Sequence, residues 1–173
     1  MLPETHLPLR GLLPRGDHFR PIVLISEVIS RSIQSVAKDR FHDIVKTALV
    51  KDGWTVTHDP FDLKTGGVEM EIDLGAERLL AAERQNEKIA VEVKSFLASS
   101  STISEFHRAL GQFINYRVAL KIVDPERLLY LAVPENVFAS FFQLDFTQSV
   151  VKENNLRLLV YSVGTQEVVT WQI

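Results

Sequence analysis

Residues 67–97 carry the clearest pattern of apolar and polar positions in the chain. Apolar residues alternate strictly with polar ones over residues 68–74, and a similar period returns over residues 89–94. Successive side chains of a β-strand point to opposite faces, so a period of two predicts strands with one buried face. Residues 85–87 are polar and predict a turn before the last strand. The segment therefore predicts three successive strands.

Two further segments have apolar residues at intervals of three and four, which is the spacing of one helix face. They span residues 39–52 and 104–120 and predict two amphipathic helices. A short strand is expected over residues 54–58, where β-branched and aromatic residues gather. Residues 127–133 are almost continuously apolar, which is typical of a strand buried on both faces.

The last part of the chain adds short helices and two closing strands. Residues 135–154 predict one or two helices, and their phenylalanine-rich part, residues 138–146, predicts core or a surface for self-association or partner binding. Residues 156–161 and 167–173 predict the two strands. The resulting order, αβββαβαββ, predicts an α/β protein with a mixed sheet covered by helices.

The first 36 residues differ from the rest. Four prolines within the first 21 residues predict irregular structure, whereas the apolar residues of 22–36 recur at helix-like intervals. This segment is either a short helix docked on the body or on a partner, or an extension that adds nothing to the fold, and we favour the second. Residues 37–173 are then one domain, as expected for a chain of this length.

The composition narrows the class of protein. With 46% hydrophobic and 24% charged residues, the chain is typical of a globular protein. The absence of cysteine excludes disulfides, thiolate zinc sites and cysteine nucleophiles. Neither a membrane-spanning apolar run nor an export signal is found, so a cytoplasmic location is expected. The net charge of −3 predicts weak non-specific binding to nucleic acid, so a role on DNA needs a basic patch, a metal ion or a basic partner.

The alternation also assigns charged residues to faces. Asp73 from the first predicted strand can converge with Glu92 and Lys94 from the third at one end of the sheet. Two carboxylates with an open side suit a hard cation, Mg²⁺ or Mn²⁺, bound together with phosphate oxygens. The lysine would orient or polarise the attacking water. The alternative is a solvated polar face with one cross-strand ion pair, and from these residues alone it is the simpler interpretation.

Other residue patterns for catalysis or ligand binding are sparse. Gln112 and Tyr116 stand four apart and share one side of the second predicted helix. The sequence has no glycine-rich phosphate loop, no pair of histidines at metal-ligand spacing on one helix and no Gly-x-Ser-x-Gly nucleophile motif.

The acids and the lysine resemble a known pattern. Asp73, the nineteen-residue spacing to Glu92, and Glu92-Val93-Lys94 within this order of helices and strands resemble the core of the PD-(D/E)XK nuclease-like superfamily. The resemblance implies a restriction-endonuclease-like core, αβββαβ, with a mixed sheet flanked by helices. It implies that Asp73 and Glu92 bind the metal ion and that all three residues serve catalysis. Ile72 stands where the nominal pattern has proline.

Two features outside the strands extend this resemblance. Gln112 and Tyr116 look like the Gln-x-x-x-Tyr motif of some branches of the superfamily, where it lies near the site and would support the substrate or the lysine. An acid on the first helix often adds a metal ligand, and Asp43, with His42 beside it, is the best match here.

A more specific resemblance covers residues 37–173. The sequence resembles the XisH family, the cyanobacterial fdxN element excision controlling factors. The matching segments are Phe41-His42-Asp43, Asp52-Gly53-Trp54, His58-Asp59-Pro60, Ile72-Asp73-Leu74-Gly75-Ala76-Glu77, Ala90-Val91-Glu92-Val93-Lys94-Ser95-Phe96, Ser104-Glu105-Phe106-His107, Leu110-Gly111-Gln112-Phe113 and Tyr130-Leu131-Ala132-Val133-Pro134.

This family resemblance implies a role in excising a DNA element during genome rearrangement. The partners that it implies are DNA, a small XisI-type controlling protein and a separate site-specific recombinase. Two functions then compete: a metal-dependent deoxyribonuclease, and a non-catalytic accessory factor that binds DNA or the recombination proteins on a nuclease-like fold. The intact acid–acid–lysine set favours the first, and the acidic net charge favours the second. A toxin–antitoxin-like pair with the XisI-type protein is a third, weaker hypothesis.

Overall fold

The structure is a computed structural model that describes residues 36, 39–80, 85–96 and 101–173. The chain divides into two units, Met1–Ile33 and Gln34–Ile173, and every described residue belongs to the second. The extension expected over residues 1–36 therefore lies, except for its last residue, outside the described residues. Over the described stretches, no helix combines the length and the apolar character needed to cross a membrane.

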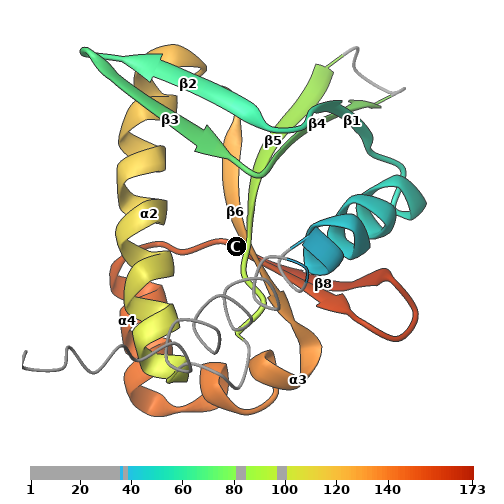
Figure 1. Ribbon diagram of the computed structural model, residues 1–173, viewed down its shortest axis with the longest axis vertical. Helices are drawn as coiled ribbons and strands as arrows, with labels where there is room; N and C mark the ends of the chain where they lie inside the picture. The colour runs from blue at the N-terminus through green and yellow to red at the C-terminus, as the bar shows by residue number, and fades with distance from the viewer. Residues whose placement is uncertain (1–35, 37–38, 81–84, 97–100) are drawn as a thin grey trace, which may run out of the picture. The chain divides into compact units, whose positions relative to one another are not determined.

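A six-stranded mixed sheet forms the centre of this unit (Figure 1). Its strands, in spatial order, are β1 (Thr55–His58), β4 (Leu74–Leu80), β5 (Gln85–Val93), β6 (Leu128–Pro134), β7 (Leu158–Ser162) and β8 (Glu167–Gln172). β5, β6 and β7 run parallel to one another, and the other neighbours are antiparallel. The expected α/β class with a mixed sheet is confirmed.

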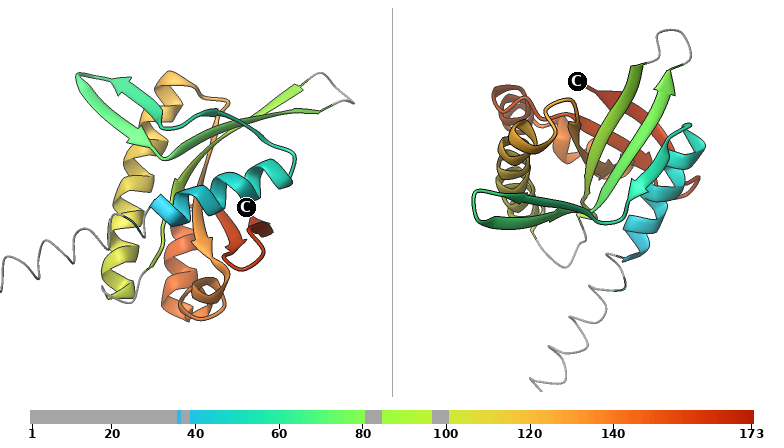
Figure 2. Two further views of the ribbon diagram at one scale, coloured as in Figure 1. Left: turned by 45° about the vertical axis from the view of Figure 1, so that its right-hand side comes forward. Right: turned by 90° about the horizontal axis from the view of Figure 1, so that it is seen from above.

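Helices cover both faces of the sheet, as the three views show (Figures 1 and 2). A helix over residues 39–51 packs on one face. The other face is covered by α2 (Thr102–Val123), α3 (Glu135–Phe138), a 3₁₀ turn (Phe141–Gln143) and α4 (Asp145–Glu153). α2 joins the parallel strands β5 and β6, which is the crossover that a parallel pair requires.

A separate hairpin, β2 (Phe61–Thr65) and β3 (Val68–Ile72), packs against α2. The single strand predicted over residues 68–74 is wrong, because the chain changes partner there: β3 pairs with β2, whereas β4 pairs with β1 and β5. Asp73 lies at the break between the two strands. β2 was not predicted, because its alternation covers only five residues.

The predicted turn at residues 85–87 is also wrong, since these residues begin β5. Glu87 pairs across the strands with Arg78, and its Oε2 accepts a hydrogen bond from Nη2 of Arg78 at 2.7 Å. The polar Glu87 therefore continues the strand with a cross-strand partner, and polarity alone did not mark a turn.

Three of the four phenylalanines in the phenylalanine-rich segment, residues 138–146, pack in or against the core. Phe142 is buried, and its ring meets those of Phe96 and Phe106 edge to face, with centroids 5.7 and 5.6 Å apart. Phe146 is the exception and is exposed. Self-association through this segment stays a prediction.

Arg127 ties α2 to the sheet. Its side chain is buried, and it donates hydrogen bonds to the carboxylates of Asp124 and Glu77 and to the carbonyl of Ile89. A buried guanidinium with its donors satisfied fixes the geometry of the groups around it. The C-terminal end of α2 is thus held at β4 and β5, next to where β6 begins.

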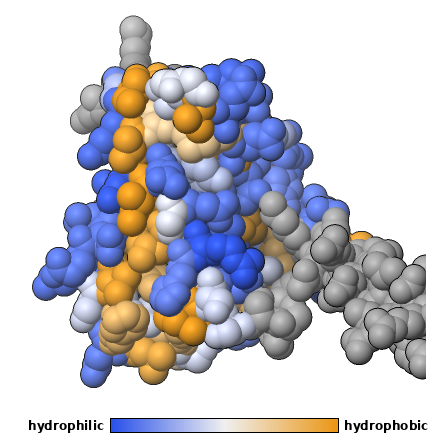
Figure 3. Space-filling model, turned by 60° about the vertical axis from the view of Figure 1, so that its left-hand side comes forward, coloured by the Kyte–Doolittle hydropathy of each residue, from blue (hydrophilic) through white to orange (hydrophobic). Residues whose placement is uncertain are grey.

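The outer side of α2 is partly apolar. Val118 and Ile122 are both more than half exposed. Figure 3 shows the molecule from the side of this helix, with a band of apolar side chains next to polar ones. The buried side of α2, with Phe106, Phe113 and Tyr116, faces the sheet and the hairpin.

Candidate functional site

The pairing of β4 with β5 places Asp73 next to Glu92. Leu74 lies opposite Val91 in this antiparallel pair, so continuing the register by one residue sets Asp73 opposite Glu92. Asp73 Oδ2 accepts a hydrogen bond from the backbone N–H of Val93 at 2.8 Å. This carboxylate is therefore fixed at the carboxyl end of β5.

Glu92 and Lys94 lie on the face of the sheet that α2 covers. The apolar residues that alternate with this face along the chain, Ile89, Val91 and Val93, belong to the core on the opposite face, beneath the helix of residues 39–51. Glu92 is only 3% exposed, and Lys94 Nζ lies 2.6 Å from its Oε1. The solvated face considered above is thus wrong for Glu92, and the ion pair joins two residues of one strand instead of crossing between strands.

α2 brings an aromatic hydroxyl to this carboxylate pair. Gln112 Nε2 donates a hydrogen bond to the hydroxyl oxygen of Tyr116 at 3.1 Å, and Tyr116 is buried. Burial raises the pKa of Tyr116, and the negative charges of Glu92 and Asp73 raise it further, although the bond from Gln112 acts in the opposite direction. Both carboxylates thus act on this hydroxyl electrostatically.

A third carboxylate, Glu71 of β3, also raises the pKa of Tyr116. Glu71 is exposed on the hairpin, and it shares the alternating polar face that led to Asp73. The sequence pattern contained this signal, but Glu71 was not singled out. The structure therefore brings together Asp73, Glu92, Lys94, Gln112 and Tyr116, with Glu71 at the border.

Asp43 lies elsewhere. It is exposed on the helix of residues 39–51, which covers the face of the sheet opposite Glu92, and its charge raises the pKa of Lys46 as the weakest of several effects. The neighbouring His42 is 2.7 Å from a carboxylate oxygen of Asp59, and Lys46 Nζ is 2.6 Å from the other. A metal-binding role for Asp43 stays a prediction.

The donor set suits a cation that is bound partly by substrate. Across residues 39–80, 85–96 and 101–173, no three histidine or acidic side chains are gathered closely enough to hold a metal ion. Asp73 and Glu92 supply two carboxylates, and Mg²⁺ typically takes one or two from the protein, with water and phosphate oxygens completing its shell. The residues therefore fit a hard cation shared with a phosphate, and they do not form a preformed cage.

Comparisons with known proteins agree on one family. The model of the XisH protein family matches residues 35–169. A solved fdxN element excision controlling factor protein from Anabaena variabilis is 54% identical, with a TM-score of 0.71, over 77% of this chain and 98% of that one. An XisH family protein from Nostoc punctiforme is 52% identical, with a TM-score of 0.71, over 78% and 99%. No curated protein matches the chain.

Proposed function

This chain belongs to the XisH family, and from that premise we propose that it controls excision of a DNA element through a metal-dependent site that cleaves DNA phosphodiester bonds. The relative from Anabaena variabilis carries the name of an excision controlling factor for the fdxN element. The DNA of such an element, an XisI-type controlling protein and a recombinase are the proposed partners.

The arrangement of the elements supports a restriction-endonuclease-like core. A helix precedes antiparallel strands, β4 and β5, and α2 then crosses to β6, which is parallel to β5. Asp73 directly precedes β4, Glu92 lies near the end of β5 and Lys94 directly follows it, so these residues lie at one end of the β4–β5 pair.

The observation that carries the proposal is the buried pair of Glu92 and Lys94 beside Asp73. Removing two charges from water costs free energy that their attraction offsets only in part, so such a pair is a weak device for stability alone. An ammonium 2.6 Å from a carboxylate is instead suited to phosphoryl chemistry, in which negative charge must be held and a water oriented.

Each side chain has a distinct role in the proposed site. Mg²⁺ or Mn²⁺ held by Asp73 and Glu92 would polarise the phosphate and lower the pKa of the attacking water. Lys94 holds charge on the phosphate and orients the water. The Tyr116 hydroxyl is protonated at neutral pH, because its pKa lies above the ordinary value of 10, so it can donate a hydrogen bond to a phosphate oxygen while it accepts one from Gln112.

The second candidate is a non-catalytic accessory factor on the same fold. It is favoured by the bond from Val93 N–H to Asp73, which gives this carboxylate a structural role, and by the net charge of −3. In this alternative the pair of Glu92 and Lys94 has only a structural role, and binding to DNA depends on partner proteins.

Cleavage assays with isosteric variants separate the two candidates. Supercoiled and branched DNA are incubated with the protein in Mg²⁺ or Mn²⁺, with and without an XisI-type protein. Asp73→Asn still accepts the bond from Val93, and Lys94→Gln keeps a donor toward Glu92, so both should fold; circular dichroism checks this. Asp62→Asn, an exposed carboxylate on β2, is the matched control.

We expect cleavage by the parent and by Asp62→Asn, and a loss of about a hundredfold or more in both site variants, since removing one electrostatic stabiliser typically costs that much. Absence of cleavage by the parent under every condition, together with Mg²⁺ binding that Asp73→Asn leaves unchanged, would establish the accessory factor instead.

A further inference from the structure

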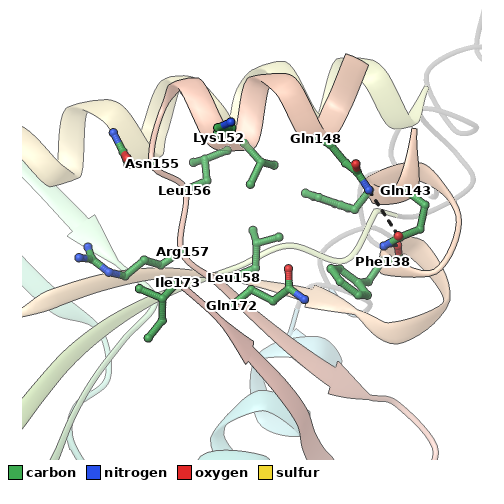
Figure 4. A pocket seen from close by; sticks show the side chains of 12 residues that line it. Phe138, Gln143, Gln148, Lys152, Asn155, Leu156, Arg157, Leu158, Gln172 and Ile173 are labelled. Atoms are coloured by element: carbon green, nitrogen blue, oxygen red, sulfur yellow. Dashed lines mark hydrogen bonds between the residues drawn. The ribbon is translucent and has the colours of Figure 1, made fainter. Parts of the chain in front are cut away.

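A second site lies away from these residues. An open cavity of about 590 Å³ is lined by α4, the 3₁₀ turn and the adjoining ends of β7 and β8 (Figure 4). Its volume is within the range of small-molecule sites. None of Asp73, Glu92, Lys94, Gln112 and Tyr116 lines it, so the proposed cleavage site does not account for it.

The polar lining is made largely of carboxamides. Four side chains of this kind contribute: Gln143, Gln148, Asn155 and Gln172. A carboxamide both donates and accepts hydrogen bonds, and its geometry matches the donor–acceptor edges of nucleobases. Gln143 and Gln148 are joined by a long hydrogen bond of 3.5 Å at one end of the cavity (Figure 4), so this weak bond can be exchanged for one to a ligand.

The charged side chains of the lining are cationic. Lys152 and Arg157 contribute, and no aspartate or glutamate does. Nε of Arg157 is buried and has no hydrogen-bond partner among the described residues. A buried donor of a charged group is costly when it is left unsatisfied. The positive charges of Arg157 and Lys152 favour an anionic ligand in the cavity. Arg157 lies at the end of the cavity away from Gln143 and Gln148 (Figure 4).

Apolar side chains form the floor between these two ends. Leu156 and Leu158 lie in the middle of the cavity, and Phe138 lies at the end formed by Gln143 and Gln148 (Figure 4). The ring of Phe138 is partly exposed and rests almost parallel on that of Phe142, with centroids 6.4 Å apart and a 25° angle. A planar ligand placed here would gain apolar contact on the same side as the carboxamides.

We propose that this cavity binds a nucleotide, with its phosphate at Arg157 and Lys152 and its base over the apolar floor, edge-on to the carboxamides. The inference rests on the proposed role on DNA, which favours a nucleotide over another phosphorylated planar molecule. Two sources share this chemistry: a free mononucleotide, and an unpaired nucleotide at the end of a DNA strand.

Isothermal titration of the full chain with dAMP and the other three deoxymononucleotides tests the proposal. We expect saturable binding in the micromolar to millimolar range that a few hydrogen bonds and one charged contact support. Lys152→Gln should raise Kd by about tenfold, which corresponds to about 1.4 kcal/mol. Lys121→Gln removes an exposed lysine of α2 outside the cavity and should leave Kd unchanged.

The parts of the ligand are tested separately. Deoxyadenosine lacks the phosphate and inorganic phosphate lacks the base, so each should bind more weakly than dAMP. Short single strands with and without a terminal phosphate distinguish the sources: an advantage over dAMP that Lys152→Gln removes assigns the cavity to a strand end, and equal affinity assigns it to a free nucleotide.

Three results would overturn the proposal: no saturable binding of any mononucleotide, equal loss in Lys152→Gln and Lys121→Gln, or inorganic phosphate that binds as well as dAMP. The proposal for the cleavage site can be wrong independently of the proposal for the cavity. If it is wrong, no cleavage is observed but dAMP still binds; if the cavity is wrong, cleavage and its loss in Asp73→Asn are unaffected.

Discussion

At the scale of single residues, the most important feature of the site is the burial of the Glu92 carboxylate. This carboxylate is almost completely buried, and Lys94 Nζ lies 2.6 Å from its Oε1. The pair contributes little net stability, because desolvation offsets most of the attraction. Loss of one partner is different, since the remaining charge stays in the interior without its counter-ion.

This asymmetry leads to a prediction for Lys94→Met. The free energy of unfolding should fall by about 3–5 kcal/mol, the usual effect of breaking a buried pair from one side. Adding Glu92→Leu should restore most of it, because the uncompensated charge is then gone. Urea denaturation of the two single variants and the double variant measures this cycle, and strictly additive losses would contradict it.

Lys64→Met is the matched control for this cycle. Its ammonium lies 3.2 Å from Glu69 Oε1, but both side chains are exposed on the hairpin. An exposed pair is screened by water, so we expect a change of no more than about 1 kcal/mol.

The residue scale also shows what the sequence could and could not reveal about the site. Alternation alone placed Glu92 and Lys94 on one face, and helical spacing placed Gln112 beside Tyr116. The alternation could not show that Glu92 is buried. The helix that covers it, α2, begins at Thr102 and so lies outside the alternating segment. The nearness of Tyr116 to Asp73 likewise depends on tertiary packing.

At the scale of elements, most helices and strands follow from the hydrophobic pattern, and the errors lie where strands change partner. One continuous alternation spans β3 and β4, yet Asp73 divides it between two sheets. A local pattern reports which face of a strand is buried and does not report which strand pairs with it. Pairing depends on the whole sheet, so the break at Asp73 was not predictable from the segment itself.

An ion pair connects the helix of residues 39–51 to the turn between β1 and β2. It predicts that the free energy of unfolding depends on pH. Burial raises the pKa of Asp59, but hydrogen bonds from Lys46 and His42 outweigh this and lower the pKa below its usual 3.8. A lowered folded-state pKa stabilises the protein above the unfolded-state value, and this contribution is lost as the pH falls through the folded-state value.

Asp59→Asn should therefore lower the free energy of unfolding at neutral pH by at most about 1 kcal/mol, since Asp59 is partly exposed. The difference from the parent should shrink as the pH falls below 3.8 and disappear once the parent carboxylate is protonated in the folded state as well. Urea denaturation at pH 7 and under acid measures both values. A difference that persists in acid would show that the carboxylate charge is not the cause.

At the scale of the whole molecule, the charge balance sets how the protein can meet DNA. The chain has nineteen lysines and arginines against twenty-two acids. Several cations among the described residues are engaged with acids: Lys46 with Asp59, Arg78 with Glu87 and Arg127 with Glu77. These engaged cations are less available to neutralise phosphates, so a divalent cation at Asp73 and Glu92 would carry much of the attraction at the proposed site.

Affinity for branched DNA should accordingly depend little on monovalent salt and strongly on a divalent cation. Binding loses about 0.9 in log K per tenfold rise in salt for each phosphate neutralised, and we expect a slope that corresponds to about three phosphates or fewer. Fluorescence anisotropy with labelled DNA, titrated with KCl in EDTA and in Ca²⁺, measures both effects. Ca²⁺ should tighten binding by the parent and by Asp62→Asn but not by Asp73→Asn. A steep salt slope in EDTA with no effect of Ca²⁺ would instead place DNA on a basic surface remote from the carboxylates.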